Sequence, residues 1–116
     1  MLLASNSFAT VQAFELRGPR AVAWATQYHP EYPLREIAAI VRRAPTLVTE
    51  GFFADEPARA AFAADLDALD REPGLRHISW RLGIDETVLD PGMRTRELSN
   101  WITGLVIPAM ARRGRG

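Results

Sequence analysis

The stretch "AVAWATQYHPEYPL", residues 21–34, decides how the fold is organised. Residues 21–28 carry no charge, and their β-branched and aromatic side chains predict a strand. Val22, Trp24 and Tyr28 would share one face of this strand, with alanines on the other. Because neither face is polar, we expect the strand to be covered on both sides. From Leu34 onward the apolar spacing becomes helical.

The residues before this strand predict further β-structure. Residues 2–5 and 8–16 have the composition of strands, and "RGPR", residues 17–20, is typical of a turn. The sequence therefore predicts a hairpin with a four-residue loop.

The residues after this stretch predict helices. The helix that begins at Leu34 should be interrupted near Pro45, and Asp55 should cap the next one. A third should cover residues 75–82 and end at Gly83. A last helix, capped by Asp90, should be interrupted at Pro108, and residues 112–116 should form a frayed tail. We therefore predict a partial α/β fold, an antiparallel hairpin or small sheet followed by four or five helices.

Composition excludes several classes of function. Fourteen acidic residues balance fourteen basic ones, so the net charge is zero and no global field favours nucleic acid. All the basic residues are arginine, and cysteine is absent, which excludes disulfides and thiolate chemistry. No apolar run approaches the ~20 residues of a membrane span, and no secretory signal is evident. We expect a cytoplasmic protein without a cofactor or metal.

His29 and Glu31 are the candidate catalytic residues. His29 lies just past the predicted strand end, where ligands bind in open α/β sheets. If the chain stays extended across Pro30, both side chains point the same way, and the carboxylate can orient the imidazole. The alternative is a strand that simply ends in a turn, with Glu31 near the start of the next helix.

The wider sequence favours the catalytic interpretation. "ASNSFATVQAFEL", a short turn and "VAWATQYHPEY" together resemble the C-terminal part of class I glutamine amidotransferases. In that family a hairpin ends in a Gln-aromatic-His-Pro-Glu motif, represented here by residues 27–31. The match is strongest over residues 4–32, and residues 34–113 resemble the helical extension of some bacterial stand-alone members.

The resemblance implies a triad in which His29 activates a cysteine thiol and Glu31 orients His29, so that ammonia is released from glutamine through a thioester. The chain has no cysteine. We therefore expect a fragment that is inactive alone and acts on glutamine only if a Cys-bearing part is supplied. Residues 1–33 would form the strand segment of the domain and residues 34–116 a helical extension packed on it, with self-association or a partner chain at the exposed sheet.

A serine nucleophile and a metal site are both disfavoured. The serines near the motif lack a Gly-x-Ser-x-Gly elbow, and His77 has no second ligand one helical turn away.

Two alternatives to the catalytic interpretation remain open. Residues 79–102 have the outline of a helix-turn-helix in which Arg94 and Arg96 would meet phosphates. The many acidic residues of these helices make nucleic acid an unfavourable partner. We expect Trp80 and Trp101 in the hydrophobic core. A non-catalytic interaction module is the other alternative.

Overall fold

The computed structural model describes residues 1–113 and divides into two compact units. The first unit contains Met1–Pro30 and the C-terminal segment that begins at Thr95, and the second is Glu31–Arg94. The boundary near Pro30 falls inside the His-Pro-Glu motif. The proposed division at residue 33 into strand segment and helical extension stays a prediction.

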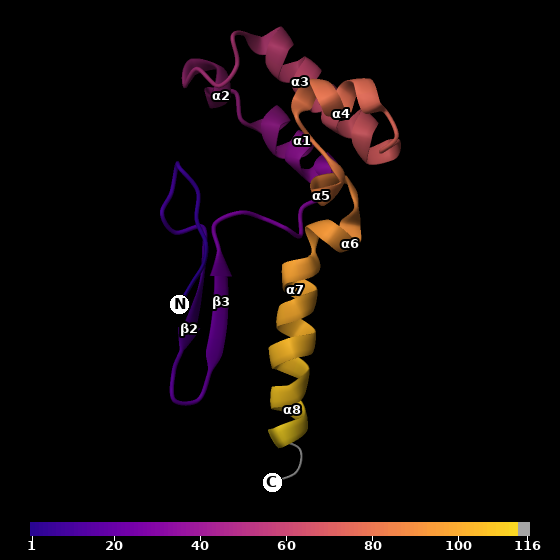
Figure 1. The fold of residues 1–116 in the computed structure, drawn as a ribbon. Coiled ribbons are helices and arrows are strands. Elements are labelled where there is room, and N and C mark those ends of the chain that lie inside the picture. The colour runs from indigo at the N-terminus through magenta and orange to yellow at the C-terminus, as the bar shows by residue number, and fades with distance from the viewer. Residues whose placement is uncertain (114–116) are drawn as a thin grey trace. The chain divides into compact units, whose positions relative to one another are not determined.

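The first unit begins with a three-stranded antiparallel sheet (Figure 1). Its strands, in the order β1-β2-β3, are β1 (Leu2–Ala4), β2 (Ala13–Arg17) and β3 (Val22–Thr26). The β2–β3 hairpin closes with Arg17 opposite Val22, and the Gly18 amide donates to the Ala21 carbonyl at 2.8 Å. The predicted hairpin and its four-residue loop are confirmed, one residue further along the chain than expected.

β2 is shorter than predicted because the chain turns ahead of it. The Asn6 side chain accepts hydrogen bonds from the amides of Phe8 and Ala9, at 3.0 and 2.9 Å. An Asx-type turn of this kind competes with strand pairing. Phe8 is left 97% exposed, and the ladder begins only at Ala13.

The C-terminal part of this unit is a helical run through α7 (Arg96–Trp101), a π-helical turn η1 (Ile102–Val106) and α8 (Ile107–Arg113). The prediction that Pro108 interrupts the helix was wrong. Proline lacks an amide hydrogen and its ring clashes with the carbonyl one turn earlier, and a π turn is one way to accommodate it. The predicted frayed tail is helical as far as Arg113, and residues 114–116 lie outside the described part.

The second unit consists of short helices packed around α3. Its members are α1 (Leu34–Arg43), α2 (Thr46–Thr49), α3 (Glu56–Arg71), α4 (Arg76–Leu82), α5 (Glu86–Leu89) and α6 (Pro91–Arg94). The predicted caps are present: Asp55 accepts from the Ala58 amide at 2.8 Å, and Asp90 accepts from the Met93 amide at 2.7 Å. Gly83 ends α4 with φ +66°, a left-handed conformation that favours glycine.

The core of the second unit lies where α1 meets α3. Leu66 and Leu69 on α3 are almost completely buried, against Ala38 and Val41 on α1. The buried Arg59 donates to the Val41 carbonyl near the end of α1, which also accepts from the Ala44 amide, so the α3 side chain joins the capping of α1. Trp80 was expected in the core, and that prediction was wrong, because its side chain is 89% exposed.

The predicted fold class is confirmed as a small antiparallel sheet followed by helices. The final predicted helix, which follows Asp90, is divided more finely than the sequence suggested, because Thr95 separates α6 from α7 and η1 separates α7 from α8. Within residues 1–113, none of the helices combines the length and the apolar character needed to cross a bilayer.

Candidate functional site

The candidate site is the segment that follows β3, and its position depends on Gln27. The Gln27 amide donates to the Gln12 carbonyl at 2.8 Å, and its side-chain nitrogen donates to the Val11 carbonyl at 2.6 Å. These bonds extend the hairpin pairing one residue beyond Thr26. The two Gln27 hydrogen bonds therefore hold the end of the strand in place.

Tyr28 ties the end of β3 to α7 within the first unit. Its hydroxyl donates to the Glu97 carboxylate at 2.5 Å, and the Thr26 hydroxyl donates to the Tyr28 carbonyl at 2.9 Å. Partial burial, together with this hydrogen bond to a carboxylate, raises the pKa of Tyr28 to about 12. Tyr28 therefore stays neutral, as a hydrogen-bond donor, over the physiological pH range.

His29 and Glu31 are both exposed, and Pro30 between them is buried. His29 is the penultimate residue of the first segment of its unit, while Glu31 opens the second unit. The backbone turns at Pro30 and Glu31. The condition of extended geometry across Pro30 is therefore not met, and strand alternation does not align His29 with Glu31. Their catalytic roles stay a prediction.

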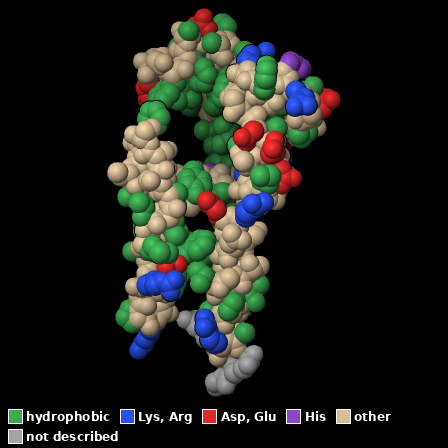
Figure 2. Space-filling model, in the orientation of Figure 1, with side chains coloured by type: hydrophobic (Ala, Val, Ile, Leu, Met, Phe, Trp, Pro, Cys, Tyr) green, Lys and Arg blue, Asp and Glu red, His purple; other side chains and the backbone are tan. Residues whose placement is uncertain are grey.

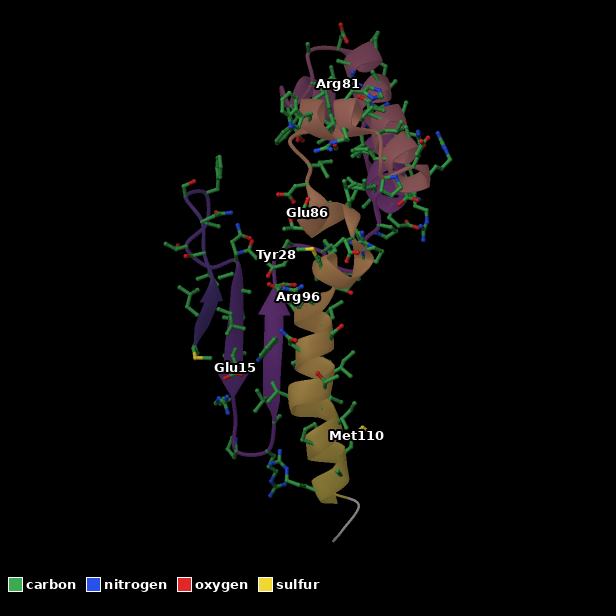
Figure 3. The ribbon with its side chains drawn as sticks, turned by 45° about the vertical axis from the view of Figure 1, so that its right-hand side comes forward. Glu15, Tyr28, Arg81, Glu86, Arg96 and Met110 are labelled. Carbon is green, nitrogen blue, oxygen red and sulfur yellow. The ribbon has the colours of Figure 1, made fainter. Side chains whose placement is uncertain are left out.

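The face of the sheet that carries Trp24 holds a buried carboxylate. Glu15 on β2 is 3% exposed and accepts hydrogen bonds from the Trp24 indole at 2.7 Å and from the Arg17 guanidinium at 2.5 Å (Figure 3 marks Glu15 and Tyr28). The Trp24 hydrogen bond, helped by Arg17, keeps the pKa of Glu15 below its ordinary value despite desolvation. The hydrogen bond between Trp24 and Glu15 therefore connects β3 to β2 through side chains, in addition to the backbone pairing of the two strands.

A cavity of about 300 Å³ in the first unit borders the motif. It is lined by Pro30, by Trp24 and Thr26 on β3, and by Glu97 and Trp101 on the helical segment, among others. Its walls are mainly aromatic and aliphatic, with the Glu97 carboxylate as a charged group. An apolar cavity with a few polar groups is the usual form of a small-molecule site.

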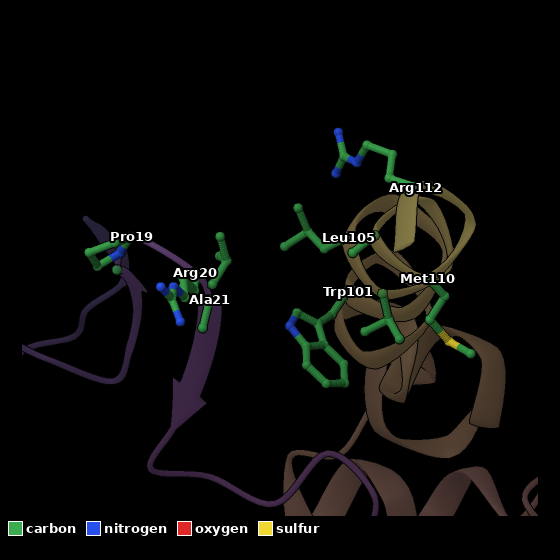
Figure 4. A pocket seen from close by; sticks show the side chains of 11 residues that line it. Pro19, Arg20, Ala21, Trp101, Leu105, Met110 and Arg112 are labelled. Carbon is green, nitrogen blue, oxygen red and sulfur yellow. The ribbon is translucent and has the colours of Figure 1, made fainter. Parts of the chain in front are cut away.

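A larger cavity of about 570 Å³ lies between the hairpin loop and the C-terminal helix (Figure 4). The loop contributes Arg20 and Ala21, and the helix contributes Trp101, Leu105 and Met110. None of the predicted site residues lines it. The smaller cavity is therefore the one associated with the motif.

Sequence reasoning missed Glu97 and Glu15. Nothing local to Glu97 indicates its hydrogen bond to Tyr28, 69 residues away in the chain. Glu15 lies directly opposite Trp24, and its signal in the sequence was that it is the only charged residue of the predicted strand at residues 8–16.

The arginines of the helix-turn-helix alternative have different environments. Arg94 is half-buried and donates from Nη1 to the Val88 carbonyl at 2.9 Å, so its guanidinium is engaged within the second unit. Arg96 is exposed in the first unit. Among the described residues, no cluster of three or more His, Asp or Glu side chains could hold a metal ion.

Comparison with known proteins points towards the glutamine amidotransferase-like superfamily. The chain is 30% identical, over 109 residues, to gamma-glutamyl-L-1-hydroxyisopropylamide hydrolase from a Pseudomonas species. The match includes 89% of the chain but 35% of that enzyme, so the chain spans about a third of the length of this relative. No protein-family model and no solved structure matches the chain.

Proposed function

We propose that the chain is the His-Pro-Glu-bearing part of a class I glutamine amidotransferase-like protein and acts in the cytoplasm. His29 is the general base and Glu31 its orienting carboxylate. The observation that carries the proposal is the motif itself, which follows β3 and is held beside the start of β2 by the Gln27 hydrogen bonds to the Gln12 and Val11 carbonyls. The similarity to a hydrolase whose name specifies a γ-glutamyl amide supports it independently.

The proposed substrate class is a γ-glutamyl amide. Glutamine is the simplest such compound, with ammonia as its amine. The substrate that the family resemblance implies and the γ-glutamyl amide named for the Pseudomonas hydrolase therefore react at the same γ-carbonyl. In the proposed reaction a thiol attacks this carbonyl, His29 takes the thiol proton and returns it to the leaving amine, and a thioester forms. Water then releases glutamate and restores the thiol.

The thiol must come from outside these 116 residues, which contain no cysteine. The proposed division of labour therefore assigns the base and its orienter to this chain and the nucleophile to a Cys-bearing segment. By this reasoning the chain alone does not release ammonia from glutamine.

The test is an ammonia-release assay with glutamine and with a γ-glutamyl alkylamide. The purified chain is assayed alone and together with the product of any adjacent upstream reading frame that encodes a Gly-rich cysteine elbow. We expect turnover only in the mixture, with loss of activity in His29→Ala and a smaller loss in Glu31→Gln. A matched control is His77→Ala, on the exposed side of α4, which should leave turnover unchanged. Turnover by the chain alone that His29→Ala abolishes would contradict the proposed division of labour.

A further inference from the structure

A buried hydrogen-bond donor in the first unit lacks an acceptor. The indole nitrogen of Trp101 is buried and has no hydrogen-bond partner within the described part of the chain. The indole projects from the helix towards the hairpin (Figure 4). Buried polar groups are normally hydrogen-bonded, because a donor without an acceptor costs the desolvation of its N–H group. A bound molecule that brings an acceptor atom to this nitrogen would remove that cost.

The charge of the adjoining cavity favours a cation. Trp101 lines the cavity of about 300 Å³ together with Glu97, and of the described residues that line it, Glu97 is the only charged one. Tyr28 donates to Oε2 of Glu97. Because a carboxylate accepts several hydrogen bonds, Glu97 keeps the capacity for a second donor. A ligand with a positively charged donor group would use this capacity.

The walls of the cavity suit the same cation. Trp24 and Thr26 line it from one face of β3, since alternate residues of a strand share a face, and Trp101 lines it from α7. Hydrophobic side chains are visible on the facing sides of the hairpin and the C-terminal helix (Figure 2). An ammonium group is attracted to the face of an aromatic ring, most strongly to that of tryptophan. A volume of about 300 Å³ is at the small end for ligand sites, so the cavity fits a small molecule.

The acceptor that meets the Trp101 nitrogen should be uncharged. None of the described residues that line the cavity is an arginine or a histidine, so an anionic acceptor would be desolvated without an opposite charge. A hydroxyl oxygen accepts a hydrogen bond without that cost. The ligand that matches the cavity therefore carries an ammonium group and a hydroxyl group on a short carbon chain.

We propose that this cavity binds a small hydroxyalkylammonium ion, with the ammonium group at Glu97 and the hydroxyl oxygen at the indole N–H of Trp101. The inference rests on the proposed function and deepens it, because hydrolysis of a γ-glutamyl amide releases an amine and the cavity borders the motif through Pro30. A primary aliphatic amine is protonated at neutral pH, as the lysine side chain is. The ligand is then the amine half of the proposed substrate.

The test is a titration of the ¹⁵N-labelled 116-residue chain with 2-aminopropan-1-ol, followed by the indole N–H signals in NMR spectra. Substitution of each tryptophan by phenylalanine assigns the signals of Trp24, Trp80 and Trp101. We expect saturable binding in the millimolar range, because so small a ligand makes few contacts. The Trp101 signal should move downfield as its N–H gains an acceptor. The signal of Trp80, which is exposed in the second unit, should stay in place as the internal control.

Three further ligands separate the two contacts. Isopropylamine lacks the hydroxyl group, and it should bind about threefold to tenfold more weakly without moving the Trp101 signal downfield. Propane-1,2-diol lacks the ammonium group, and it should bind about tenfold more weakly or worse, because it has no charge to place at Glu97. Alanine carries a carboxylate in place of the hydroxymethyl group, and it should not bind measurably.

Variants of the cavity give the matching result from the side of the protein. Glu97→Gln should weaken binding of 2-aminopropan-1-ol about tenfold and leave that of propane-1,2-diol unchanged. Trp101→Phe keeps an aromatic ring and removes the N–H donor, so 2-aminopropan-1-ol should lose its advantage over isopropylamine. Met110→Ala is the matched control, because Met110 lines the larger cavity and not this one, and it should leave both affinities unchanged. Far-UV circular dichroism establishes that each variant keeps its secondary structure.

Three results would overturn the proposal. They are a Trp101 signal that does not shift saturably with 2-aminopropan-1-ol, equal affinities for this ligand and propane-1,2-diol, and a loss of binding in Met110→Ala as large as that in Glu97→Gln. The last result would place the ligand in the larger cavity.

Turnover of γ-glutamyl amides in the mixture with a Cys-bearing segment is measured separately. Turnover without amine binding would contradict the cavity ligand and leave the proposed function in place. Saturable amine binding without turnover would support the cavity ligand and contradict the proposed function.

Discussion

The bond between Tyr28 and Glu97 gives the sharpest prediction, because it connects the motif segment to α7. Tyr28→Phe removes the hydroxyl donor and keeps the ring, so packing is preserved. A hydrogen bond to a charged group contributes ~1.5–3 kcal/mol when buried. Tyr28 is 36% exposed, and solvent screening reduces the expected loss to about 1 kcal/mol at pH 7.

The same bond predicts an alkaline loss of stability. The pKa of Tyr28 rises from 10.0 to about 12 on folding, so its contribution is complete below pH 10 and disappears as the pH rises through about 12. The difference in unfolding free energy between wild type and Tyr28→Phe should therefore shrink towards zero over this interval. The chain has no lysine and no cysteine, so few other groups titrate there.

The assay is urea unfolding at a series of pH values, followed by tryptophan fluorescence in a Trp80→Phe background, which leaves Trp24 and Trp101 in the unit of Tyr28. Tyrosinate absorbance of a Tyr32→Phe variant reports the titration of Tyr28 alone. Glu97→Gln is the companion variant, because it keeps an acceptor and removes the charge. A stability difference that is equal at pH 7 and above pH 12, or absent at pH 7, would refute the reasoning.

Three further predictions concern the stability of the two units. Leu66→Ala should lower the unfolding free energy by roughly 2.7–5 kcal/mol, since Leu66 is 2% exposed in the α1–α3 core; thermal or urea unfolding measures this, and a loss below about 1 kcal/mol would contradict the packing. Asp55→Ala should cost about 1 kcal/mol through loss of the α3 cap, with Asp55→Asn as the control that retains it. Glu15 has a lowered pKa, so its contribution is present above its ordinary pKa of 4.5 and is lost as the pH falls through the lower folded value. Acid titration followed by Trp24 fluorescence should show this transition and lose it in Glu15→Gln; an unchanged titration in that variant would exclude Glu15 as its source.

Local chemistry explains which elements could be predicted from the sequence. Asp55, Asp90 and Gly83 act within one turn of their own helix, so capping rules identify them without tertiary information. Strand lengths were less predictable. The Asn6 turn removed the start of the predicted second strand, since a side chain that bonds its own backbone competes with pairing.

The register of the hairpin shows how a small error in a loop propagates. A loop at residues 17–20 would place Leu16 opposite Ala21, whereas the structure places Arg17 opposite Val22. The pairing moves by two residues, so each side chain keeps its face but changes its partner. Trp24 thereby comes opposite Glu15, and the buried carboxylate gains its indole donor.

The candidate site was predictable as a motif and not as a geometry. Residues 27–31 were recognisable in the sequence. The hydrogen bonds of Gln27 follow from the position of this residue directly after a strand. The turn at Pro30 and the bond from Tyr28 to Glu97 were not recognisable, because both depend on segments that come together only in the folded unit.

The π turn at Ile102–Val106 amounts to one additional residue accommodated within a helix. An additional residue rotates every later side chain by about 100° around the helix axis while the backbone stays hydrogen-bonded. Ile107 and Met110 follow this turn, and they are 54% and 67% exposed. The π turn at residues 102–106 therefore sets which side of α8 carries Ile107 and Met110.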